Sequence, residues 1–174
     1  MEDYNESFTN NFFFSITVLL FSISLSQAKA QRTLTVGGNN WTVTIPSITE
    51  AGTNYAGTYE SAANQILLTA SVPLLLGSGK VSVRYEANPT WNSSLILNAR
   101  RTGDGTTVCV LCSISGGTTY QPIGLTDVEL FRIVAIATLA SYSNIPIQLQ
   151  LSGVSVTVPA ATYNSRIVFT ISEI

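Results

Sequence analysis

The sequence predicts an all-β protein, a single antiparallel β-sandwich of the Ig-like or jelly-roll kind that follows an N-terminal signal peptide. Short runs in which apolar residues alternate with period two recur along the chain, and Gly, Pro, Asn and Asp separate them. Charged residues make up only 10% of the 174 residues, well below the usual share of roughly a quarter. We therefore divide the chain into a leader (1–30), an N-terminal arm (31–45) and a sandwich domain (46–174).

The leader has the composition of a secretory signal peptide. Its apolar run, residues 12–26, is shorter than the roughly 20 residues that span a bilayer. Ala28-Lys29-Ala30 offers the small residues that signal peptidase accepts, which predicts cleavage before Gln31 and a secreted protein. The first eleven residues contain Glu and Asp but no Lys or Arg. Retention of the segment as an anchor is therefore the alternative.

The arm contains two alternating runs, residues 31–36 and 40–45, on either side of Gly37-Gly38-Asn39. Glycines between short strands predict a turn or kink. The apolar residues change parity across this turn, so each run is expected to present one apolar face. The residues of these faces are Leu34, Val36, Trp41, Val43 and Ile45.

Further strands are expected in the middle of the chain, and Pro73, Pro89 and glycine pairs end them. In one of them Val81 and Val83 face inward, and Ser82 faces outward. Residues 101–106 have the composition of a turn, and Arg100-Arg101 is interpreted as a solvated strand end. The expected strands cover residues 65–72, 80–86, 94–100 and 107–115.

Residues 127–140 fit two structures. Thr126 and Glu129 could form a capping box, and several apolar residues lie at helical spacing. The many β-branched residues and the all-strand context favour a strand, which is the structure we expect.

The C-terminal residues carry the clearest alternation. Apolar residues hold one parity over 145–151 and the other over 154–158, so Ser152-Gly153 is expected to form a bulge or tight turn between two strands. A last strand, residues 167–171, runs almost to the C-terminus. The chain is therefore expected to end inside a sheet.

The residue types argue against an enzyme. The chain has no histidine, which excludes histidine general acid–base catalysis and the commonest transition-metal ligand. Nothing in the sequence brings Glu60 and Glu86 together as a glycosidase pair, and Asp104 alone in a glycine turn is far from a calcium loop. We expect no metal and no cofactor. The balanced charge gives no electrostatic footprint for nucleic acid.

Cys109 and Cys112 form a C-x-x-C motif with β-like flanks on both sides. A redox motif would begin a helix, and a zinc site would need further ligands. A local disulfide is one possibility, but positions three apart in a strand face opposite ways, so it requires a turn between them. Free thiols and an intermolecular bridge are the alternatives.

Trp41, Trp91 and Tyr120 are candidate stacking platforms for a sugar ring, although aromatic residues of sandwiches are more often core or turn anchors. They support the alternative that the chain is a secreted carbohydrate-binding or adhesin module with a monomeric sandwich. A donor strand would bury Trp41, whereas a sugar platform would expose it.

The layout resembles secreted bacterial fimbrial subunits, the group that includes chaperone–usher pilins and spore-coat-U-like proteins. The resemblance rests on the leader, the alternating arm and a Pro-Ala-x-Thr-Tyr turn before the last strand. Chaperone–usher pilins differ in placing a disulfide between well-separated cysteines. The matching residues at the C-terminus are Pro159, Ala160, Thr162, Tyr163 and 168–172.

The resemblance implies a structural subunit of an extracellular filament, pilus or surface layer on a bacterial cell. In that group an extended segment of one subunit completes the incomplete sandwich of the next. The arm is the candidate donor strand, and self-association is head to tail. A periplasmic chaperone or outer-membrane assembly machinery is an implied partner. The arm could equally be the first strand of its own monomer.

Overall fold

The computed structural model describes residues 31–174 except 56, 74–76 and 137–139. Within these residues the chain forms strands and no helix, and so no helix that could cross a bilayer. The predicted signal peptide, residues 1–30, lies outside the described residues. The strands are β1 (Thr33–Gly38), β2 (Thr58–Glu60), β3 (Ile66–Val72), β4 (Ser78–Ala87), β5 (Ile96–Arg101), β6 (Thr106–Thr107), β7 (Cys112–Ser115), β8 (Gln121–Pro122), β9 (Val128–Ala135), β10 (Ala140–Ser152) and β11 (Ser165–Ser172).

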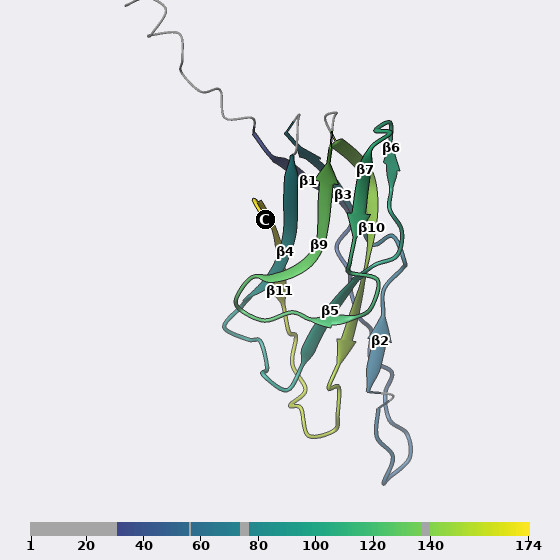
Figure 1. Cartoon of the computed structure of the whole chain (residues 1–174). Coiled ribbons are helices and arrows are strands. Elements are labelled where there is room, and N and C mark those ends of the chain that lie inside the picture. Colours follow the sequence, from purple (N-terminus) through teal and green to yellow (C-terminus); the bar gives the residue numbers. More distant parts are fainter. Residues whose placement is uncertain (1–30, 56, 74–76, 137–139) are drawn as a thin grey trace, which may run out of the picture.

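The strands form two antiparallel sheets (Figure 1). The larger sheet has the order β1-β3-β10-β5-β8, with β2 and β6 also paired to β10, and the smaller sheet has the order β11-β4-β9-β7. The all-β prediction is confirmed, and the arrangement is consistent with a β-sandwich. β1 and β11 are edge strands of the two sheets, and they contact each other.

One apolar core joins the two sheets. Leu68, Ile145 and Ile147 enter it from the larger sheet, and Phe131 and Ile133 enter it from the smaller sheet, all with at most 1% of their surface exposed. Burying such side chains is the main favourable term in folding. The burial of Val81 and Val83 on β4 and of Ile145 and Ile147 on β10 therefore matches the predicted inward faces. Residues 128–135 are a strand, as expected.

The predicted strand at residues 154–158 is wrong. β10 ends at Ser152, and Gly153 adopts a positive φ of 81° that an L side chain rarely tolerates. A Cβ atom there would lie 2.0 Å from the Ser94 carbonyl oxygen, so the backbone passes too close for any other residue. The chain leaves the sheet at this turn, and residues 153–164 form an irregular connection to β11.

The predicted solvent exposure of Arg101 is wrong. Arg101 is only 5% exposed, because odd-numbered residues of β5 face inward. Its guanidinium donates to the carbonyl oxygen of Gly116 and forms an ion pair with Asp104. In β4, Val81 and Val83 face the core as expected, and Ser82 between them is buried as well.

Candidate functional site

The first half of the arm pairs within its own chain. β1 lies antiparallel to β3 along its full length. At its end the Asn39 N–H donates to the Gln65 carbonyl oxygen over 3.3 Å, and Gln65 Nε2 donates to the Asn39 carbonyl oxygen over 2.8 Å. In the isolated chain, β1 is therefore the edge strand of the larger sheet.

The second half of the arm has the side-chain pattern of a strand without its backbone pairing. Trp41, Val43 and Ile45 are half-buried, and the threonines between them are exposed. Among the described residues, no backbone hydrogen bond involves residues 41–45. The predicted second strand is therefore absent, although its apolar face points toward the core. A backbone that lacks a partner is held by side-chain burial alone.

These side chains lie along an apolar groove with a volume of about 1170 Å³. One wall is the inner face of β5 and β10, and the other is β11 with the connection before it. β11 pairs only with β4 among the described strands, so its outer backbone edge is open. The principal apolar residues of the groove, besides the arm, are Leu97, Leu149, Leu151, Val154, Ile167 and Phe169.

The groove closes at the end where β1 begins. Arg32 Nε donates to the Ser78 carbonyl oxygen over 2.7 Å, and Arg32 Nη2 lies 3.2 Å from the Glu173 carboxylate at the end of β11. A side chain that precedes β1 thus ties the larger sheet's edge to the smaller sheet. From this closed end the two edges run toward residues 41–45, which lie in the groove.

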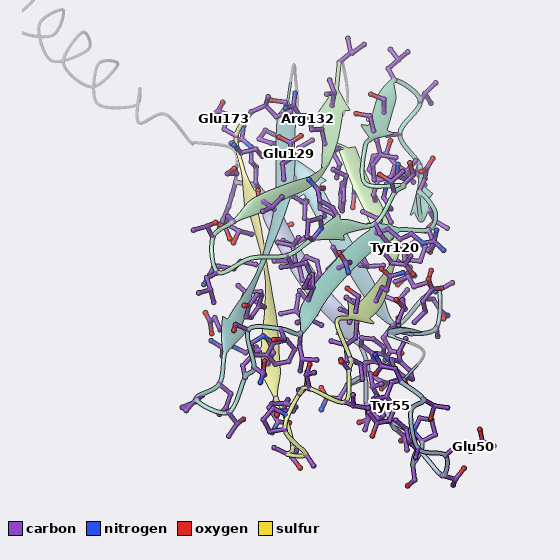
Figure 2. The ribbon with its side chains drawn as sticks, turned by 90° about the horizontal axis from the view of Figure 1, so that it is seen from below. Glu50, Tyr55, Tyr120, Glu129, Arg132 and Glu173 are labelled. Carbon is purple, nitrogen blue, oxygen red and sulfur yellow. A yellow bond between two sulfur atoms is a disulfide. The ribbon has the colours of Figure 1, made fainter. Side chains whose placement is uncertain are left out.

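The three candidate stacking residues do not lie together. Trp41 and Trp91 both line the groove, and the Trp91 ring packs against Tyr85 with centroids 5.6 Å apart. Tyr120 lies elsewhere, with the Arg100 guanidinium 4.4 Å from its ring centroid. Figure 2 shows Tyr120 well apart from Tyr55, another groove residue. The three residues therefore belong to two separate places, and only Trp41 and Trp91 share the groove.

Tyr120 belongs to a polar network that the sequence did not reveal. Arg100 donates two hydrogen bonds to Gln148 Oε1, and Gln148 Nε2 donates to the Ser61 carbonyl oxygen. Burial raises the pKa of the Tyr120 hydroxyl. Because the guanidinium covers one face of the ring, a sugar could stack only on the other face.

The acidic residues form ion pairs in place of a catalytic pair. Glu60 is on β2 and accepts a hydrogen bond from Gln150 Nε2, whereas Glu86 is on β4 in the other sheet. Hydrogen bonds from Arg166 and then Arg84 hold the pKa of Glu86 below its usual range. Within the described residues, no three His, Cys, Asp or Glu side chains are grouped as metal ligands would be.

Cys109 and Cys112 form the local disulfide, with their Cα atoms 5.7 Å apart. The predicted strand at 107–115 is interrupted accordingly: β6 ends at Thr107, the loop turns, and β7 begins at Cys112. This is the turn that a bridge between positions three apart requires.

No protein-family model matches the sequence, and no curated protein or solved structure matches the chain. No family is thereby established, and the resemblance to fimbrial subunits is an expectation that these comparisons leave untested. The groove and the arm that lines it are consequently the features from which a function is inferred.

Sequence reasoning identified the arm but missed the other side of the groove. Ile167 and Phe169 were expected in a core strand, yet both are half-buried on β11 at the sheet edge. Their alternation predicts an inward face but not whether a neighbouring strand covers it.

Proposed function

We propose that the chain is a structural, non-enzymatic subunit of a secreted bacterial filament, pilus or surface layer, and that it assembles head to tail by strand exchange through its arm. The subunit is a single β-sandwich of the Ig-like or jelly-roll kind, exported by its leader. A periplasmic chaperone or an outer-membrane assembly machinery would hold the arm's groove before assembly.

One observation carries the proposal. Residues 41–45 line the groove with half-buried apolar side chains, while their backbone groups lack hydrogen-bond partners among the described residues. A strand that entered the groove beside β11 would gain the main-chain hydrogen bonds that this segment lacks. Each such bond contributes about 1 kcal/mol net, so a donor that pairs with β11 has a driving force for replacing the arm.

The lengths of the edge strands β11 and β1 determine how many residues a donor strand can pair with. β11 offers eight residues to pair, from Ser165 to Ser172, and β1 offers six to β3. A neighbour's arm of the same sequence carries both alternating runs, so its apolar residues can repeat the contacts made in the monomer. Successive side chains of a strand point to opposite faces, so a shift of the donor by one residue would expose its apolar side chains. The alternation therefore fixes the register of the donor.

A cysteine pair tests whether the arm is exchanged. Thr33 and Ser71 face each other across β1 and β3, with their hydroxyl oxygens 2.5 Å apart. In the Thr33→Cys/Ser71→Cys variant, oxidation of the monomer should lock the arm in place and prevent polymer formation. Oxidation after assembly should instead link neighbours, giving covalent ladders on non-reducing gels.

Wild-type chain under the same oxidising and reducing conditions is the control, because it retains the Cys109–Cys112 bridge. Size-exclusion chromatography and negative-stain microscopy report the polymer. Fibres formed by the locked monomer, or by a chain without residues 31–45, would refute strand exchange.

A carbohydrate-binding or adhesin module is the second candidate. It is favoured by the position of Trp41 and Trp91 in one groove, and by the buried Trp91 Nε1, which has no hydrogen-bond partner among the described residues. A glycan array with tryptophan fluorescence tests it. A ligand that quenches wild type but not Trp91→Phe would favour this function, and no response in either would remove it.

A further inference from the structure

The loop between β6 and β7 carries apolar side chains into solvent. Val108 is 96% exposed, Val110 is 87% exposed and Leu111 is 53% exposed. Ile136, just beyond β9, is 57% exposed, and its N–H donates to the Leu111 carbonyl oxygen over 3.2 Å. We call these four residues the apolar tip. Single exposed aliphatic residues are ordinary, but four on one projecting loop and its neighbour mark an interaction site.

The Cys109–Cys112 disulfide keeps the tip in this form. It closes the loop that holds Val110 and Leu111, and the Cys109 N–H donates to Thr107 Oγ1 over 3.2 Å. A covalently closed loop of this size has little freedom to turn its valines back onto the sheets. The exposure of Val110 and Leu111 is thus built into the covalent structure.

The surroundings of the tip are uncharged. Residues 105–115, 133–136 and 140–144 contain no Asp, Glu, Lys or Arg, and Thr and Ser supply most of the polar groups. Elsewhere the outer strands carry ion pairs, such as Arg166 with Glu86. The tip therefore offers apolar contact and hydroxyl groups, with no charge to recognise a charged partner.

The tip lies at the end of the domain where the leader is attached (Figure 1). Ser78 is opposite Val134 in β9, Val134 is opposite Ser113 in β7, and Arg32 donates to the Ser78 carbonyl oxygen. The start of β1 and the tip are consequently at the same level of the two sheets.

We propose that the apolar tip inserts into a lipid surface and so docks this end of the domain on a membrane. Four aliphatic side chains present roughly 300 Å², which is small beside the roughly 800 Å² that each partner buries in a stable protein complex. A fluid bilayer needs no complementary shape and receives projecting aliphatic side chains directly. The groove lies toward the other end of β10, so strand exchange and membrane docking do not compete.

Vesicle flotation tests the insertion. All the core residues described above follow Gln31, so the chain from Gln31 to Ile174 is used with phosphatidylcholine vesicles. Wild type should float with the vesicles, and Val108→Ser/Val110→Ser should bind at least tenfold more weakly. Leu125→Ser is the matched control, because Leu125 is 63% exposed outside the tip and its loss should leave binding unchanged.

A fluorescent variant reports the contact directly. The emission that Val108→Trp adds to the Trp41 and Trp91 background should shift to the blue on vesicles and be quenched by brominated lipid. Because no charge surrounds the tip, adding anionic lipid should not strengthen binding. Failure of wild type to float, undiminished binding by the double serine variant, an absence of quenching, or binding that requires anionic lipid would each overturn the proposal. So would a double variant that loses self-association but still binds lipid.

Discussion

Arg32 should control how readily the arm leaves its own groove. Its side chain is 20% exposed, whereas the Glu173 side chain is 76% exposed, so their ion pair contributes at most about 1 kcal/mol. The charge-assisted hydrogen bond from Arg32 Nε to the Ser78 carbonyl oxygen, at 2.7 Å, contributes about 1.5 kcal/mol or more. Arg32→Ala should therefore favour opening of the arm by about 2 kcal/mol, or roughly thirtyfold.

Hydrogen exchange of the β1 amides in the monomer measures this opening directly. Arg32→Ala should lower their protection roughly thirtyfold and speed polymer growth, whereas Glu173→Gln, which removes only the ion pair, should change protection by about fivefold at most. Arg132→Ala is the control, because Arg132 pairs with Glu129 on β9 and does not line the groove. Protection of β1 in Arg32→Ala within twofold of wild type would refute the argument that Arg32 holds the arm.

Two further predictions concern stability. Gly153→Ala should lower the free energy of unfolding by more than 3 kcal/mol, because the cost of its positive φ adds to the clash with the Ser94 carbonyl oxygen. Gly52 also has a positive φ of 84° but open space around it, so Gly52→Ala should lower the free energy of unfolding by only about 1 kcal/mol. Urea titration measures both values. Equal losses would contradict the role assigned to the close approach. The lowered pKa of Glu86 means that its contribution is present above the carboxyl pKa of the unfolded chain and is lost as pH falls through the lower folded value. Glu86→Gln should accordingly flatten the acid limb of the stability profile, and an unchanged limb would argue against these hydrogen bonds.

The sequence predicted most of the central strands because alternation reports directly on burial. β3, β9 and β10 each present one apolar face, and Leu68, Ile133 and Ile147 are fully buried as that pattern requires. The apolar residues of β9 also fit the spacing of a helix, but its β-branched residues favoured a strand, and that prediction is confirmed.

The failures have separate physical causes. The alternation of residues 154–158 is that of a strand, but the positive φ of Gly153 takes the chain out of the sheet, and only tertiary contact with Ser94 explains that turn. Arg101 faces inward because β5 continues one residue beyond the predicted end, and its charge is satisfied by Gly116 and Asp104, which lie outside that strand. Neither partner could be assigned from local sequence.

The sequence predicted the apolar residues of the arm but not which strand they pack beside. Trp41, Val43 and Ile45 need an apolar surface on one side, and alternation alone is satisfied equally by their own groove or by that of a neighbour. What distinguishes the two cases is the backbone, since a side-chain pattern says nothing about which strand supplies hydrogen bonds. In the monomer these three residues bury their side chains while residues 41–45 lack backbone partners among the described residues. A donor strand could therefore cover the same apolar surface and also form backbone hydrogen bonds. This gain in hydrogen bonds would drive exchange of the arm.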